Sequence, residues 1–179
     1  TIMRMDEGCD TGPILLQRST PIEPLDTAGT LFARLAPMGA SLLASALPKV
    51  LDGSLQAVEQ DSARATQAPI IVKELGRIDW TWEALRIADL VRGVEPWPGA
   101  YTFTDAGLRL RIFPFVAPID GNGCPGEILS IDQDGMRVAT GRGAVLVREV
   151  QPAGGRSMDA RELAAGRRIA VGMVLGGTP

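Results

Sequence analysis

The sequence of 179 residues contains no histidine and only two cysteines. Without an imidazole, the chain by itself supplies no histidine base and few zinc sites. Cys9 and Cys124 are far apart and form no CxxC pattern, so we expect no metal cluster or disulfide framework and a reducing cytoplasm. There is also no uninterrupted run of about 18 apolar residues, which predicts no membrane span and no membrane partner.

Charge of either sign is not in large excess, because the formal net charge is −3. From Gly76 onward the chain has twelve acidic and twelve basic residues, and every basic one is arginine. Arginine suits phosphate better than lysine does. A GC-rich genome explains the same usage, so both interpretations stay open. The hydrophobic share of 45% is enough for a buried core.

The first sixty residues have the pattern of the end of an α/β unit. Residues 1–5 and 13–22 are expected strands, separated by a glycine-rich loop at 6–12. A helix is expected from Asp26 to about Gly53, because apolar residues recur every three or four positions. Strand, loop, strand and long helix together complete such a unit rather than form a whole domain.

The pattern changes after a polar stretch that we interpret as a linker. Residues 81–93 predict an amphipathic helix that ends at Gly93, and residues 159–165 predict a last short helix. Short strands with glycine-rich turns lie between them and predict a small barrel. These strands are expected at residues 101–104, 108–116, 126–131, 136–140 and 144–150.

The segment DEGCDTG at residues 6–12 is the candidate site for chemistry. Three carboxylates follow a strand in a glycine loop, where α/β folds place ligands, and Asp10 can orient a histidine or hold a water. A plain turn rich in Asp and Gly explains the segment equally well. A divalent metal is a further reading, although the loop is too short for an EF-hand. Cys9 is expected to be inert, since nothing in the chain lowers its pKa.

Arginines in the second part form another candidate site. Arg109 and Arg111 are two residues apart on an expected strand and therefore share one face, and Arg167 and Arg168 form a cluster near the end. Such a surface can follow a phosphate backbone. A solvated, salt-bridged surface is the alternative, because acidic residues are equally numerous.

Several segments resemble known proteins. TIMRMDEGCDTGPIL at residues 1–15 resembles the closing active-site segment of the 10-formyltetrahydrofolate-dependent formyltransferases. RIDW at 77–80, VRGVEPWPGAYT at 91–102 and VREVQPAGGRSMDARELAAGRR at 147–168 resemble the second domain of the methionyl-tRNA formyltransferases. The resemblance runs from one end of the chain to the other.

This resemblance implies a fold class of α/β plus β. Residues 1–60 would be the end of a Rossmann-like catalytic domain, residues 61–76 a linker, and residues 77–179 an OB-like barrel that binds tRNA. The implied reaction moves a formyl group from 10-formyltetrahydrofolate to the α-amine of methionine on initiator tRNA. It implies no metal, a cytoplasmic location and a monomer when the protein is complete.

The resemblance also implies roles for individual residues. Asp10 would act beside an Asn and a His, and the folate pocket would be lined by Asp6, Glu7, Gly8, Cys9 and Asp10. The family linker carries a KxxK pair, of which Lys73 fits the second position while Ile70 occupies the first. The expected tRNA-binding residues are Lys73, Arg109, Arg111, Arg156, Arg167 and Arg168.

The chain opens on Thr1 within an expected strand, which predicts a fragment. In family order the Asn, the His and an SLLP-type loop precede this point. We therefore expect the chain as given to be catalytically inactive.

Two other functions remain open. One is a formyltransferase acting on a small amine, such as a nucleotide-linked amino sugar, although the RIDW and QPAG segments argue against it. The other is a non-catalytic RNA-binding barrel with a vestigial α/β piece. That reading would gain if the gene encoded no Asn, His and SLLP-like loop upstream.

Overall fold

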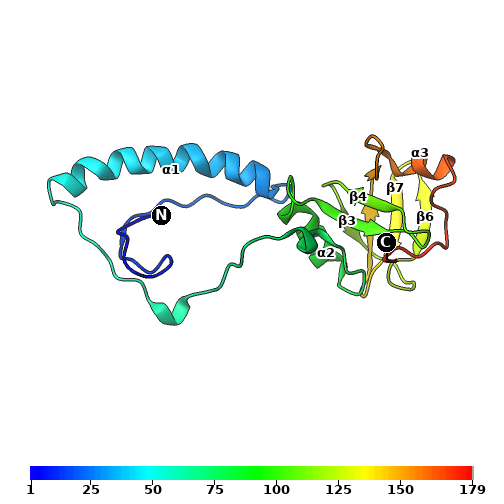
Figure 1. Cartoon of the computed structure of the whole chain (residues 1–179), viewed down its shortest axis with the longest axis horizontal. Coiled ribbons are helices and arrows are strands. Elements are labelled where there is room, and N and C mark those ends of the chain that lie inside the picture. Colours follow the sequence, from blue (N-terminus) through cyan, green and yellow to red (C-terminus); the bar gives the residue numbers. More distant parts are fainter. Residues whose placement is uncertain (179) are drawn as a thin grey trace. The chain divides into compact units, whose positions relative to one another are not determined.

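The computed structural model describes residues 1–178, which divide into two compact units. The first unit is Thr1–Ile70, and the second begins at Ile71. The first contains a small hairpin and the long helix α1, and the second contains two sheets and two short helices (Figure 1).

A short antiparallel hairpin opens the first unit. Strand β1 (Ile2–Met3) pairs with β2 (Ile14–Leu16), so the DEGCDTG loop joins two adjacent strands. The backbone of Val58 then pairs with Ile14, with N–H···O distances of 2.8 and 2.9 Å. Both expected strands are therefore present but shorter than the apolar pattern predicted. A one-turn 3-10 helix, Ser62–Arg64, follows.

The predicted long helix is confirmed as α1 (Ala28–Leu51). It begins with a capping box, in which the hydroxyl of Thr27 accepts from the Thr30 amide at 3.1 Å and the hydroxyl of Thr30 accepts from the Thr27 amide at 2.9 Å. The apolar face predicted from the spacing is the more buried one. It includes the half-buried or buried residues Leu31, Met38, Leu42 and Ala46, although Leu35 and Val50 of the same series are exposed.

Most of the α1 surface is exposed within the described chain. By length and composition this helix is long and apolar enough to cross a membrane, although the sequence contains no uninterrupted apolar run of about 18 residues. One such helix is weak evidence for a membrane span, because core helices of soluble proteins and signal sequences share this length and composition. Arg34 on α1 forms an ion pair with Asp26, just before the helix.

Eight antiparallel strands of the second unit form two four-stranded sheets. In spatial order, the first contains β10 (Met158–Asp159), β9 (Glu149–Pro152), β4 (Arg109–Ile112) and β3 (Ala100–Phe103). The second contains β5 (Ala117–Ile119), β8 (Ala144–Val147), β7 (Gly135–Ala139) and β6 (Ile128–Asp132). Between Ile71 and Thr178 no strand of one sheet pairs with a strand of the other. The hydrogen-bonded ladders thus form two sheets rather than a closed barrel.

The strands predicted from the sequence differ from the structure of this unit in two respects. The single strand expected at residues 144–150 is divided at Arg148, so that β8 and β9 belong to different sheets. The segment reads as one strand in the sequence because apolar residues lie on both sides of Arg148 and Glu149 and contribute to the same core. The short strands β5 and β10 were not predicted, since three and two residues are too few to show an alternating pattern.

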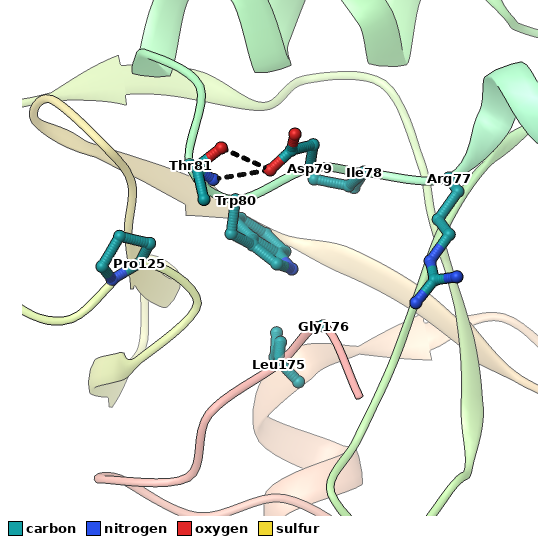
Figure 2. A pocket seen from close by; sticks show the side chains of 8 residues that line it. All are labelled: Arg77, Ile78, Asp79, Trp80, Thr81, Pro125, Leu175 and Gly176. Carbon is teal, nitrogen blue, oxygen red and sulfur yellow. Dashed lines mark hydrogen bonds between the residues drawn. The ribbon is translucent and has the colours of Figure 1, made fainter. Parts of the chain in front are cut away.

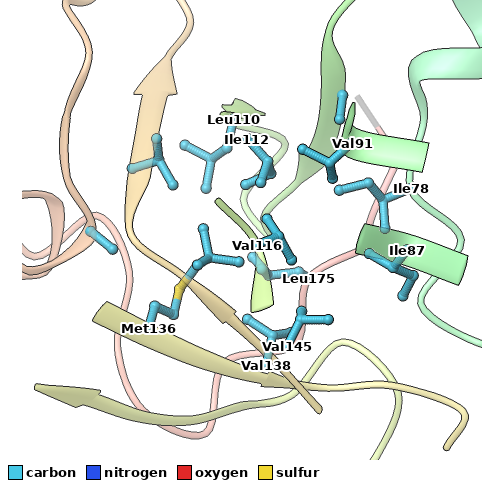
Figure 3. Packing of buried hydrophobic residues seen from close by; sticks show 14 of the residues in the cluster. Ile78, Ile87, Val91, Leu110, Ile112, Val116, Met136, Val138, Val145 and Leu175 are labelled. Carbon is cyan, nitrogen blue, oxygen red and sulfur yellow. The ribbon is translucent and has the colours of Figure 1, made fainter. Parts of the chain in front are cut away.

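The core of the second unit lies among these sheets and helix α2 (Ala84–Gly93), as Figure 3 shows. Ile87 and Val91, one turn apart on α2, are fully buried. Alternate residues of the strands are buried with them, as a strand with one face to the core requires. The largest of these are Leu110, Ile112, Ile128, Met136, Val138, Val145, Val147 and Val150. Helix α3 (Ala160–Ala165) adds the buried Leu163, and a 3-10 turn at Lys73–Gly76 precedes the core.

Candidate functional site

The DEGCDTG loop is shaped by its first carboxylate. The Asp6 side chain accepts hydrogen bonds from the Gly8 amide at 3.1 Å and from the Thr11 hydroxyl at 2.7 Å. A β-carbon on Gly8 would lie 2.1 Å from the same hydroxyl. Asp6 and Gly8, both predicted to line a folate pocket, therefore also define the loop's own conformation.

The loop closes onto the strand that precedes it. A β-carbon on Gly12 would lie 1.7 Å from the carbonyl oxygen of Arg4, so only glycine permits this approach. The Arg4 amide donates to the Pro13 carbonyl at 2.9 Å across the same gap. The two ends of the loop are thus fixed next to each other, and residues between them project outward.

Asp10 has the least common backbone conformation in this loop. Its φ is +57°, in the left-handed region that non-glycine residues seldom adopt. Its side chain is exposed, and within residues 1–178 no hydrogen bond or ion pair holds its carboxylate. The carboxylate is therefore free to act on a group outside the described chain.

A cavity of about 530 Å³ adjoins Asp10. It is lined by the loop on one side and on the other by Glu59, Gln60, Asp61, Ser62, Arg64 and Ala65. Gln60 contacts the loop directly, since its side-chain amide donates to the carbonyl of Asp10 at 2.9 Å and to that of Gly12 at 2.7 Å. This contact could not be predicted from local sequence patterns, because Gln60 is about fifty positions away from the loop.

The other predicted loop residues, Glu7, Gly8 and Cys9, are exposed. Backbone groups of an exposed glycine loop are accessible to a flat heterocyclic ligand, so these residues fit a folate contact through the main chain. In the part of the chain that the structure describes, no cluster of three or more Cys, Asp or Glu side chains is arranged to hold a metal. The alternative of a divalent cation in this loop has no support in the geometry.

The predicted arginine pair does share one face of a sheet. Arg111 lies opposite Tyr101, and Arg109 lies opposite Phe103, in the register of β3 and β4. The guanidinium of Arg109 lies over the Tyr101 ring at 4.2 Å from its centroid. Arg111 also forms an ion pair with Glu95 at 2.9 Å. Only Arg109 of this pair therefore lacks an acidic partner among the described residues.

The remaining residues predicted to bind tRNA also differ in whether they have an acidic partner. Arg156 forms an ion pair with Glu162 at 2.9 Å, whereas Lys73, Arg167 and Arg168 are exposed and have no acidic partner between residues 1 and 178. Arg156 and Arg168 line a cavity of about 370 Å³, and Arg109 and Arg111 line one of about 270 Å³. Pro152 lines both cavities, so these four arginines belong to adjoining parts of the surface.

The RIDW segment lines a further cavity, of about 460 Å³, shown in Figure 2. Trp80 is buried beneath it, and its ring N–H donates to the Thr102 hydroxyl at 2.9 Å. Its backbone carbonyl accepts from the Gly141 amide at 2.9 Å. Asp79 accepts from both the hydroxyl (2.6 Å) and the amide (3.0 Å) of Thr81. These hydrogen bonds therefore hold the RIDW segment, which precedes α2, against β3 and the turn that follows β7.

Replacing Thr81 with alanine tests how much the contact between Asp79 and Thr81 stabilises the fold, because this contribution depends on pH. The Thr81 hydroxyl is the main cause that lowers the pKa of Asp79 below 3.8 in the folded state. Stability from this contact is therefore present above that pH and lost as the pH falls through the lower folded pKa. We expect a loss of about 0.5–1 kcal/mol near pH 7, since water screens the exposed carboxylate.

Urea denaturation at several pH values measures this effect. The difference between the wild type and Thr81→Ala should shrink as the pH falls below the ordinary value of 3.8 toward the lower folded pKa of Asp79. Asp79→Asn is the control, because it removes the charge and with it this part of the pH dependence. A difference that grows as the pH falls through this acidic range would contradict the assignment.

Comparisons with known proteins agree with the two-unit structure. A sequence model described as "Formyl transferase, C-terminal domain" matches residues 70–168, and one described as "Formyl transferase" matches residues 1–47. Among curated proteins, the chain is 42% identical over 176 residues to a methionyl-tRNA formyltransferase from Desulfotalea psychrophila. It is 44% identical over 176 residues to one from Caldanaerobacter subterraneus.

Both alignments cover 98% of this chain, but 54% and 56% of the relatives. The chain thus spans about half the length of the curated relatives it matches. Among solved structures, it is similar to HypX from Aquifex aeolicus in complex with tetrahydrofolic acid, with a TM-score of 0.63 and 18% identity. That match covers 94% of this chain and 30% of HypX, and at this identity it supports the fold alone.

Proposed function

Since the chain belongs to the formyl transferase family, we propose that it works in the transfer of a formyl group from 10-formyltetrahydrofolate to the methionine α-amine of initiator methionyl-tRNA. The relatives at 42% and 44% identity carry the name methionyl-tRNA formyltransferase, which supports this substrate over others. The observation that carries the proposal is the exposed, unpaired Asp10 in a loop of family sequence.

Asp10 is proposed to act on a histidine. When the amine attacks the formyl carbon, a nearby imidazole takes the amine proton or donates one to the leaving nitrogen. A carboxylate against that ring fixes its orientation and favours its protonated form. This chain has no histidine, so the imidazole is proposed to come from outside it, and the resemblance implies the same for the family asparagine. We therefore expect the chain as given to be inactive by itself.

The folate is proposed to contact residues 6–10 mainly through backbone groups. The hydrogen bonds from Gly8 and Thr11 to Asp6 give this backbone a fixed conformation before any ligand binds. A fixed loop loses less conformational entropy on binding. The roles of Asp6, Glu7, Gly8 and Cys9 are thus contact roles, whereas Asp10 alone is proposed to be catalytic.

The tRNA is proposed to bind the second unit on the surface around Pro152. Arg109 and Arg111 line one of the two adjoining cavities on this surface, and Arg156 and Arg168 line the other. Lys73 and Arg167 would add further phosphate contacts. Tyr101 and Phe103 lie on the same sheet face as Arg109, and aromatic rings beside arginines suit unpaired bases.

We further propose the finer organisation that the resemblance implies. Residues 1–60 belong to the catalytic domain, residues 61–76 act as the linker, and residues 77–179 form the tRNA-binding domain. We propose that residues 77–179 are OB-like, with their two sheets arranged as a partly open barrel. The protein would act in the cytoplasm as a monomer, without a membrane.

The proposed function is tested with the longest product of the gene that encodes this chain. Purified protein is incubated with 10-formyltetrahydrofolate and either initiator methionyl-tRNA or a nucleotide-linked amino sugar, and formylated product is counted. Transfer to the tRNA is the expected result. Transfer to the amino sugar alone would replace the proposal with the small-amine reading, and tRNA binding without any transfer would favour the non-catalytic barrel.

Arg109 should account for part of the electrostatic binding of tRNA. We expect Arg109→Ala to weaken binding by the 1–179 chain and to reduce the slope of log K against log salt by about 0.7–0.9, as for one lost phosphate contact. Arg142→Ala is the matched control, because Arg142 is exposed and paired with Glu83 at 2.7 Å. Equal slopes for the wild type and Arg109→Ala would remove Arg109 from the interface.

A further inference from the structure

The polypeptide after α1 returns to the candidate catalytic loop. Val58 exchanges two backbone hydrogen bonds with Ile14, an isolated bridge that places the chain just before Gln60 next to β2. Gln60 then reaches the loop between β1 and β2. Its side-chain amide donates one hydrogen to the Asp10 carbonyl at 2.9 Å and one to the Gly12 carbonyl at 2.7 Å.

These two hydrogen bonds lie on either side of Thr11. They fix the orientation of the peptide groups that follow Asp10 and Gly12, because both hydrogens of one rigid carboxamide must be satisfied together. The distances are those of well-formed N–H···O bonds. The segment that this amide holds is the one in which Asp10 adopts a φ of +57°.

A left-handed conformation is unfavourable for most non-glycine residues, although Asp adopts it more readily than most, and contacts to the neighbouring backbone help to hold it. No side-chain contact within residues 1–178 holds the Asp10 carboxylate itself. Its direction is therefore set by its backbone. The carboxamide of Gln60 is the side chain that contacts this backbone directly.

We propose that Gln60 is a positioning residue for Asp10. Its side-chain amide orients the Asp10 carboxylate through its hydrogen bonds to the backbone carbonyl groups of Asp10 and Gly12. This inference rests on the proposed role of Asp10 in formyl transfer. Gln60 itself touches no reacting atom in this scheme. Misplacing a catalytic group by about 1 Å can lower the rate by about 100-fold, so Gln60 should affect the chemical step rather than the binding of either substrate.

Substitutions that separate hydrogen-bond donation from shape provide the test, made in the longest product of the gene. Gln60→Met keeps the length of the side chain but removes both donors. Gln60→Lys keeps a group with enough hydrogens to donate to both carbonyls. Gln56→Met is the matched control, since Gln56 is exposed four positions earlier and within residues 1–178 forms no hydrogen bond to the loop.

We expect Gln60→Met to lower kcat about 10- to 100-fold with unchanged KM for both substrates. Gln60→Lys should recover most of that loss, and Gln56→Met should match the wild type. An unchanged kcat in Gln60→Met, a rise in KM alone, or no recovery by Gln60→Lys would overturn the proposal. If Gln60 had a purely structural role, the kcat values of Gln60→Met and Gln60→Lys would not differ according to whether the side chain can donate hydrogen bonds.

Carbon-13 NMR of the 1–179 chain separates this inference from the proposed function. Loss of the hydrogen bonds in Gln60→Met should shift the carbonyl resonances of Asp10 and Gly12 and leave those of the second unit unchanged. If no formyl transfer occurs even in the wild type, the role of Asp10 fails and the positioning role fails with it, although the shifts persist. If transfer occurs but the shifts do not change, the contact by Gln60 is refuted alone.

Discussion

Replacing Asp10 with asparagine is expected to lower kcat for formyl transfer by about 10²–10⁴-fold, the range for losing a group that supports acid–base catalysis. Asparagine keeps the size of the side chain and tolerates the left-handed φ of +57° better than most residues do. The loop should therefore keep its conformation while the negative charge is lost. The measurement is steady-state formylation of initiator methionyl-tRNA by the longest product of the gene.

A matched acidic residue controls for general effects of charge. Glu23 belongs to the same unit, is exposed and lies outside the DEGCDTG loop. Glu23→Gln should therefore retain wild-type kcat and KM. If Asp10→Asn and Glu23→Gln are equally active, Asp10 has no catalytic role, and the unpaired carboxylate is a surface feature of the turn.

Replacing Gly141 with alanine is expected to destabilise the second unit by roughly 2–4 kcal/mol, which combines overpacking with strained hydrogen bonds. A β-carbon there would lie 1.8 Å from the carbonyl oxygen of Thr81. Backbone must therefore move, and the Gly141 amide donates to the carbonyls of both Trp80 (2.9 Å) and Trp82 (2.8 Å). Any shift that relieves the clash also lengthens these two bonds.

Urea denaturation followed by tryptophan fluorescence measures this loss, because Trp80 is buried in the affected region. Gly93→Ala is the control, since Gly93 ends α2 and a β-carbon there has no atom within 4 Å. That change should be neutral or stabilise by up to about 1 kcal/mol. A Gly141→Ala protein as stable as Gly93→Ala would mean that RIDW is not held by this close contact.

Local features of the fold followed from the sequence. The apolar spacing placed α1 within about two residues of its observed ends. Glycine-rich turns were expected between the short strands, and Asp134-Gly135 between β6 and β7 is one of them. The position of Arg109 and Arg111 on one sheet face followed from the two-residue period of a strand. Each of these depends on neighbours within a few positions.

The electrostatic state of the candidate tRNA residues did not follow from the sequence. Arg111 and Arg156 are partly neutralised by Glu95 and Glu162. Equal numbers of acidic and basic residues allowed many pairings, and the sequence favoured none of them. The six predicted cations therefore differ in a way that only the packing of β4, α3 and their neighbouring loops reveals.

The sequence by itself placed the candidate site at DEGCDTG, because this segment combines carboxylates with glycine, which permits close backbone approach, and the resemblance to the formyltransferases implied the role of Asp10. Only the tertiary structure decided how Asp10 is held. The contact from Gln60 crosses fifty residues, and the pattern at residues 144–150 did not reveal that this segment contributes one strand to each of the two sheets. Periodicity records which side of an element is buried, whereas the partner of each group depends on how distant segments fold together.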